Sequence, residues 1–220
     1  MRLGFYILYY GVGRSLFTII FRVIFRTRII GRDRVPREGG LLAVCNHISF
    51  ADPPLLGVAM PRPVQFMTMA EMFRKPWMAG PLRTIGCFPV DRSRVDHGAV
   101  RETIRRLRAG HCIAIFPEGG IRLTQQSVLG GDPDFKPGAG SIALLGAAAI
   151  LPVIVRGTRK PYAARNWFPV HRNGLRRETI NITFGYPFCL WNPDGLAADE
   201  RRQRADDVLR EQLLKTVELN

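Results

Sequence analysis

The sequence predicts an α/β fold in which helices flank a mostly parallel central sheet. Two observations lead to this prediction. Short apolar runs bounded by glycine, proline or charged residues recur along the chain, and stretches with helical periodicity lie between them. Such alternation is typical of parallel strands joined by helices that cover the sheet. With 220 residues, the chain is long enough for one domain of this kind and a short N-terminal appendage.

Five segments have the length and composition of strands. Four are short apolar runs, which indicate strands buried on both faces, and the last one alternates apolar with polar residues. The expected strands are residues 41–45, 64–68, 112–116, 151–155 and 179–184.

Helical periodicity marks three segments in the body of the chain. Residues 96–108 place Val100 and Leu107 on one face and arginines on the other. Residues 140–149 are rich in alanine and leucine, and residues 197–219 form a polar amphipathic helix that closes the chain. These segments supply the helical layers of the expected fold.

The first 30 residues are strongly apolar, but arginines interrupt them, so no run of about 18 uncharged apolar residues is present. At helical period Arg14 and Arg22 share one stripe, and Val12 lies on the opposite arc. A helix of this kind lies flat in a bilayer interface; a helix packed on the protein's own core is the alternative. We therefore expect residues 1–30 to be a membrane-associating helix and residues 31–220 to form the main domain.

The charge balance points to an anionic partner. The formal net charge is +14, which suits nucleic acid, lipid headgroups or a phosphorylated substrate. No nucleic-acid-binding motif is found, which favours lipid. The chain also lacks a P-loop, a dinucleotide fingerprint and a G-x-S-x-G elbow. The four cysteines lie far apart without a C-x-x-C pair, which argues against zinc and disulfides and favours free thiols in a reducing compartment.

The most informative segment reads N-H-I-S-F-A-D-P-P. It follows the strand 41–45 and precedes an apolar helix, so it lies where α/β folds place ligand crevices. His47 is suited to general-base catalysis near neutral pH, and Asp52 can accept a hydrogen bond from its ring. Two alternatives remain open: Asp52 caps the helix that begins at Pro53, and His47 is a core histidine.

Two further segments place polar residues after apolar runs. F-P-E-G-G-I-R begins at Phe116 and carries Glu118 and Arg122 beside glycines, where backbone can approach a ligand. G-C-F-P-V-D-R ends in Asp91 and Arg92. A surface ion pair is the alternative interpretation of these last two residues.

Together these segments resemble the 1-acylglycerol-3-phosphate acyltransferase family. An N-H-x-x-x-x-D block, G-x-F-x-x-D-R, F-P-E-G and an apolar strand containing Pro152 follow one another in the family's order from about residue 39 to residue 157. The resemblance implies a glycerolipid-acyltransferase fold, a lysophospholipid acceptor and an acyl-CoA or acyl-carrier-protein donor. It implies no metal and no cofactor beyond the donor.

The resemblance also assigns roles to residues. His47 matches the family's catalytic base, and Asp52 matches the carboxylate that orients it. Asp91 and Arg92 match the block that helps to bind the phosphate of the acceptor.

The third block carries one departure from the family. Glu118 and Gly119 match residues assigned to acceptor binding. The family usually continues with a small hydroxyl residue and then arginine, whereas here Gly120 and Ile121 precede Arg122. Arg122 stands one position late, and the change signals an acceptor that can differ from lysophosphatidate.

We therefore expect a membrane-surface acyltransferase of phospholipid biosynthesis, with residues 31–220 as the acyltransferase domain. The free cysteines and the basic N-terminal segment favour the cytoplasmic face of the cell membrane. The first alternative is another acceptor: glycerol 3-phosphate, another lysolipid or an amino-acid lipid. The second is a basic, non-enzymatic protein that binds membranes or nucleic acid.

Overall fold

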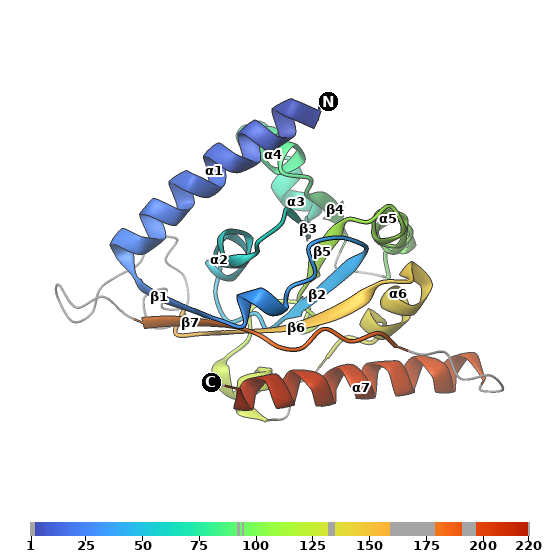
Figure 1. Cartoon of the computed structure of the whole chain (residues 1–220). Coiled ribbons are helices and arrows are strands. Elements are labelled where there is room, and N and C mark those ends of the chain that lie inside the picture. Colours follow the sequence, from blue (N-terminus) through green and yellow to red (C-terminus); the bar gives the residue numbers. More distant parts are fainter. Residues whose placement is uncertain are drawn as a thin grey trace.

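A computed structural model describes residues 3–91, 93, 95–131, 135–158, 179–190 and 197–219. These residues contain a seven-stranded sheet (Figure 1). Its strands are β1 (Arg26–Ile30), β2 (Leu41–Cys45), β3 (Val64–Met69), β4 (Phe88–Val90), β5 (Cys112–Ile115), β6 (Ala149–Arg156) and β7 (Thr179–Phe184).

The strand order is β1-β7-β6-β2-β5-β3-β4. Every pairing in it is parallel except β6 with β7, which is antiparallel. The expected α/β fold with a mostly parallel sheet is therefore confirmed. Strand β2 lies at the centre, so the residues that follow it open onto the middle of one sheet edge.

Seven α-helices and three short 3₁₀ helices surround the sheet within the described residues. The α-helices are α1 (Leu3–Ile24), α2 (Asp52–Ala59), α3 (Ala70–Phe73), α4 (Pro76–Thr84), α5 (His97–Arg108), α6 (Ala139–Gly146) and α7 (Ala198–Glu218). The 3₁₀ helices are η1 (Arg32–Arg34), η2 (Thr124–Gln126) and η3 (Val128–Gly130).

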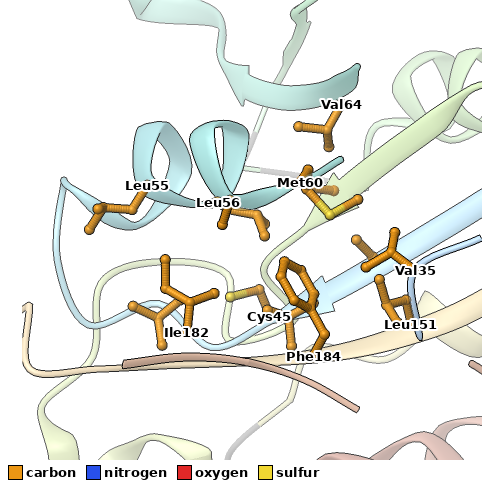
Figure 2. Close-up of a cluster of buried hydrophobic side chains, with 14 of the residues drawn as sticks. Val35, Cys45, Leu55, Leu56, Met60, Val64, Leu151, Ile182 and Phe184 are labelled. Atoms are coloured by element: carbon orange, nitrogen blue, oxygen red, sulfur yellow. The ribbon is translucent and has the colours of Figure 1, made fainter. Parts of the chain in front are cut away.

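Two apolar layers sandwich the sheet. One face packs against α2 (Figure 2) and the end of α1, and Phe25, the residue after α1, is buried in the same layer. Leu56 of α2 and Phe184 of β7 meet in this layer. The other face packs against α5, α6 and α7 through residues such as Leu107 and Leu209. Alternate strand residues point to opposite faces, which is why continuous apolar runs form these strands.

The sequence pattern did not predict two of the strands, β1 and β4. The R-T-R-I-I segment of β1 resembles the end of the N-terminal helix, but its edge position beside β7 lets its two arginine side chains reach solvent. Strand β4 has three residues, too few for a periodic signal. The helix expected over 1–30 therefore ends at Ile24, and the last five of these residues belong to the sheet.

Other boundaries shift for identifiable reasons. The helix expected over 140–149 ends at Gly146, because Ala147 takes a left-handed conformation with φ 49° and Ala149 already begins β6. Helix α5 begins where Asp96 accepts a hydrogen bond from the N–H of Ala99 at 2.9 Å. In the described part of the chain, no helix combines the length and apolarity needed to cross a bilayer.

Candidate active site

The candidate site begins where the chain leaves the central strand β2. Continuing the register of β2 with β6 would place residue 47 opposite Val155. Instead the Asn46 side chain takes these bonds: its Nδ2 donates to the Val155 carbonyl at 2.9 Å, and its Oδ1 accepts from the Val155 N–H at 2.7 Å. The buried amide therefore ends the strand at a fixed point and releases His47 from the sheet.

His47 and Asp52 form a buried pair. The distance from His47 Nδ1 to Asp52 Oδ2 is 3.0 Å. The same carboxylate oxygen accepts from the N–H groups of Ile48 and Ser49, both at 2.7 Å. Because a carboxylate only accepts hydrogen bonds, Nδ1 of His47 carries the proton. The Nε2 atom is then the basic nitrogen of the ring.

Asp52 does not act as the helix cap that we had considered. It is the first residue of α2, and the N-cap position belongs to Ala51, which makes no side-chain capping bond. Pro53 and Pro54 have no backbone N–H, so the first turn offers few donors to a cap. The Asp52 carboxylate points instead to the backbone and ring that precede the helix.

The second oxygen of Asp52 has a partner that sequence reasoning missed. The hydroxyl of Thr158 donates to Asp52 Oδ1 at 2.7 Å, and both residues are fully buried. Thr158 follows β6 and lies 106 positions from Asp52 in sequence. Its only sequence signal is its place just after an apolar strand and Gly157.

The His47 ring packs on an aromatic side chain of the neighbouring strand end. Its centroid lies 4.4 Å from that of Phe116, with the rings 28° apart. The Phe116 ring in turn stacks on the ring of Phe66, and the centroids of these two rings lie 6.4 Å apart. Stacking on Phe116 fixes the plane of the imidazole, and the bond to Asp52 fixes the direction of Nδ1. The His47 side chain is 8% exposed.

Glu118 lies behind the histidine rather than in an open pocket. Its Oε2 accepts from the backbone N–H of His47 at 2.9 Å. Its Oε1 accepts from the Ser127 hydroxyl at 2.6 Å and from the Val128 N–H at 3.2 Å. Burial raises the pKa of the Glu118 carboxyl, and these three donors oppose that shift. Glu118 therefore ties the loop after β2 to η3.

The remaining members of the F-P-E-G-G-I-R segment lie next to this loop. Gly119 has a φ of 71°, and a Cβ there would collide with the side chain of Lys136. The Arg122 N–H donates to the His47 carbonyl at 2.8 Å, and its Nε donates to the Glu118 carbonyl at 3.2 Å. Arg122 thus stands beside His47 although it is one position late in the motif.

The other expected residues lie further away or outside the description. Asp91 follows β4, three strand positions from β2, and its carboxylate accepts from the N–H of Ser93 at 3.0 Å. Arg92 lies outside the described residues. The structure therefore brings together His47, Asp52, Glu118 and Arg122, with Asp91 at the flank of the same sheet edge.

The start of helix α6, where backbone N–H groups could bind an anion, is occupied by a carboxylate of the protein itself. A helix start flanked by glycines can present backbone N–H groups to a phosphate, and α6 begins in this way after Gly138. In the structure the two oxygens of Asp206, on α7, accept from the N–H groups of Gly138 and Gly140 at 2.9 Å each. This helix start therefore carries an internal carboxylate cap.

Cys45, two residues before the histidine, does not have the properties of a nucleophile. It is completely buried. Burial, and then the charges of Asp52 and Glu118, raise the pKa of its thiol well above the usual value. Since the thiolate is the reactive form, the site favours chemistry that the imidazole performs directly.

The fold and the site define a class of protein. A buried histidine that a carboxylate orients at the end of a central parallel strand has the chemistry of a general base. The family model described as Acyltransferase matches residues 26–156, more than half of the chain. The chain belongs to the Acyltransferase family, and it is an acyltransferase.

Comparison with known proteins gives similar results. The chain is 30% identical over 187 residues to the 1-acyl-sn-glycerol-3-phosphate acyltransferase of Bacillus subtilis, covering 84% of this chain and 85% of that protein. It is 28% identical over 163 residues to the enzyme of that name from Streptococcus pneumoniae, covering 72% and 54%. The crystal structure of the 1-acyl-sn-glycerophosphate (LPA) acyltransferase from Thermotoga maritima superimposes with a TM-score of 0.68 at 20% identity, covering 94% and 79%. At that identity the likeness supports the fold.

Proposed function

We propose that the protein transfers a fatty acyl group from acyl-CoA or acyl-carrier protein to the free hydroxyl of 1-acylglycerol 3-phosphate, a step of phospholipid biosynthesis. The observation that carries the proposal is the 3.0 Å bond between His47 and Asp52, which leaves Nε2 of the ring as a base. The names of the relatives supply the acceptor: both curated proteins are 1-acyl-sn-glycerol-3-phosphate acyltransferases.

The proposed reaction is a direct transfer. Nε2 of His47 takes the proton of the acceptor hydroxyl while the hydroxyl oxygen attacks the thioester carbonyl. The new C–O bond forms, the C–S bond breaks, and the departing thiolate receives the proton from the imidazolium. Asp52 stabilises the imidazolium between these two proton transfers.

The basic residues of the second and third blocks are our candidates for binding the acceptor phosphate. The backbone N–H of Arg122 is bonded to the His47 carbonyl and its Nε to the Glu118 carbonyl, so its guanidinium lies beside the loop that carries His47. Arg92 is proposed from the family resemblance, with Asp91 beside it. Glu118 and Gly119 would serve acceptor binding by shaping the loop, because both carboxylate oxygens of Glu118 are occupied by internal donors.

We also propose that α1 rests on the cytoplasmic face of an anionic membrane. Four aliphatic side chains at positions i, i+4, i+7 and i+11 form an outward apolar stripe on this helix. They are Val12, Leu16, Ile19 and Val23, with exposed fractions of 60%, 56%, 61% and 61%. Exposed apolar stripes of this kind mark partner or lipid surfaces. Trp77 on α4 is 70% exposed, and α4 contacts α1 (Figure 1). An exposed tryptophan is typical of a membrane interface.

The activity is tested with purified protein, a radiolabelled donor of each type and a panel of acceptors. We expect labelled phosphatidate from 1-acylglycerol 3-phosphate, and a loss of at least about 10²-fold in kcat for His47→Ala. The exposed His97→Ala is the matched control and should keep full activity. If only glycerol 3-phosphate or only another lysolipid is acylated, that compound is the acceptor instead of 1-acylglycerol 3-phosphate. Near-normal turnover of His47→Ala would refute the mechanism.

A further inference from the structure

We propose that Thr158 is a positioning residue of the reaction, which holds the Asp52 carboxylate in the orientation that serves His47. The inference rests on the proposed role of His47 as the base. The observation behind it is the 2.7 Å hydrogen bond from the Thr158 hydroxyl to Asp52 Oδ1, formed between two fully buried side chains.

The two oxygens of Asp52 are held from different parts of the chain. The donors of the loop after β2 converge on Oδ2: the His47 ring and the N–H groups of Ile48 and Ser49. Within the described residues, the donor to Oδ1 is the hydroxyl of Thr158, which follows β6. The loop alone would hold one oxygen and leave the carboxylate free to turn about it, since the last torsion of an aspartate is broad. The bond from Thr158 stops that rotation.

The position of Thr158 is itself determined by the end of β6. Gly157 has a φ of 87°, a region that favours glycine, and a Cβ there would collide with the carbonyl oxygen of Thr179. Two residues earlier, Val155 is bonded in both directions to the Asn46 side chain. Hydrogen bonds between Asn46 and Val155 therefore join the ends of β2 and β6, and Gly157 packs closely against Thr179. The Thr158 hydroxyl thus reaches Asp52 from a backbone that is held in place.

The chemistry of the site explains why this bond matters for turnover. The carboxylate orients the imidazole and stabilises its protonated form, and both effects depend on the direction of Oδ2. Without the hydroxyl, Oδ1 becomes a buried, charged acceptor without its donor, which favours a turned or displaced carboxylate. Substrate binding does not pass through this bond, so kcat should respond and KM should not.

The test compares three variants. Thr158→Val removes the hydroxyl at nearly constant volume, Thr158→Ser keeps it, and Thr103→Val removes an equally buried hydroxyl that is bonded to the Ala99 carbonyl within α5. For Thr158→Val we expect a loss of about 10- to 100-fold in kcat with the acceptor KM within about twofold. Thr158→Ser should recover most of the rate, and Thr103→Val should keep all of it.

A spectroscopic measurement separates positioning from general damage. In ¹⁵N-labelled protein the His47 ring should show the Nδ1–H tautomer in the wild type and in Thr158→Ser, and a mixture of tautomers in Thr158→Val. If Thr158→Val does not fold, the ¹⁵N spectrum of the His47 ring is recorded in Thr158→Ala, which also lacks the hydroxyl. Full kcat or an unchanged ring spectrum in the hydroxyl-free variant would overturn the inference, as would failure of Thr158→Ser to recover the rate. An active His47→Ala assayed in parallel would instead refute the proposed function, whatever Thr158 does.

Discussion

The backbone N–H of His47 donates a hydrogen bond to Glu118 Oε2 at 2.9 Å, so the acidic residue of the F-P-E-G segment holds the peptide of the histidine itself. The other oxygen of Glu118 accepts from Ser127 and Val128 on the opposite side. Glu118, which the family resemblance assigns to acceptor binding, thus also holds the backbone of the proposed base.

Glu118→Gln should therefore impair both stability and turnover. The amide keeps one acceptor and turns the other into a donor, which must face either the His47 N–H or the Ser127–Val128 side. We expect a loss of about 1–3 kcal/mol in the free energy of unfolding and at least a tenfold loss of kcat. Chemical denaturation and steady-state kinetics measure the two effects. Wild-type stability in this variant would contradict the framework role.

Asp52→Asn should separate charge from geometry. An asparagine can keep its oxygen on the His47 side and donate its amide to the Thr158 oxygen, but it carries no charge to stabilise an imidazolium. We expect kcat to fall by about 10²–10⁴-fold with little change in KM. The exposed Asp33→Asn is the control and should behave as wild type. An equal effect of both substitutions would count against the assignment.

Asp206→Asn should destabilise the protein without changing its affinity for the phosphate of the acceptor. The Asp206 carboxylate receives two N–H groups at the start of α6, and its charge suits the positive end of that helix. We expect the free energy of unfolding to fall by about 0.5–2 kcal/mol. The neighbouring exposed Asp207→Asn should cost less. A raised acceptor KM in Asp206→Asn alone would indicate that this helix start takes part in binding.

The stability of the protein should decline in acid partly through Glu102. Its hydrogen bond to Arg105, together with Arg106, lowers the pKa of this carboxyl from 4.5 to about 2, against an opposing effect of burial. A lowered pKa in the folded state adds stability above pH 4.5, and this stability is lost as the pH falls towards 2. We expect less than about 1 kcal/mol, because solvent screens the pair. Denaturation of Glu102→Gln against pH should show a flatter decline between these values.

Leu16→Ser should weaken binding to anionic vesicles more than Leu145→Ser does. The two leucines are equally exposed, at 56% and 55%, but only Leu16 belongs to the apolar stripe of α1. Removing one aliphatic side chain from a lipid contact costs about 1.5–3 kcal/mol, which corresponds to a roughly 10- to 100-fold weaker partition coefficient. Co-sedimentation with vesicles measures it. Equal binding of both variants would place the lipid contact elsewhere.

Much of the fold could be predicted because its strands have a simple signal. Strands β2, β5 and β6 are buried along nearly their whole length and are marked by continuous apolar runs, and β3 is mainly apolar. The bounds of all four were found to within two residues. Strand β1 carries charged residues at an edge and continues directly from a helix, so its sequence resembles that helix. Pairing with β7, which begins about 150 residues later, decides its conformation.

The site could be predicted only where its residues are local. His47 and Asp52 lie five positions apart, and their 3.0 Å contact follows from one loop. The bonds from Thr158 to Asp52 and from Asn46 to Val155 span more than 100 residues, and one sequence carries no sign of such pairs. The burial of Glu118 was likewise hidden, since an acidic residue beside glycines suggests an open pocket rather than an internal brace.

The junction between α1 and the sheet has a mechanical consequence. Helix α1 ends at Ile24 and β1 begins at Arg26, with the buried Phe25 between them. Only one residue separates the two elements, so the direction of α1 is coupled to that of β1. In the proposed membrane-bound state, the surface that contacts α1 would therefore set the tilt and the height of the sheet, and with them the direction from which a substrate reaches His47.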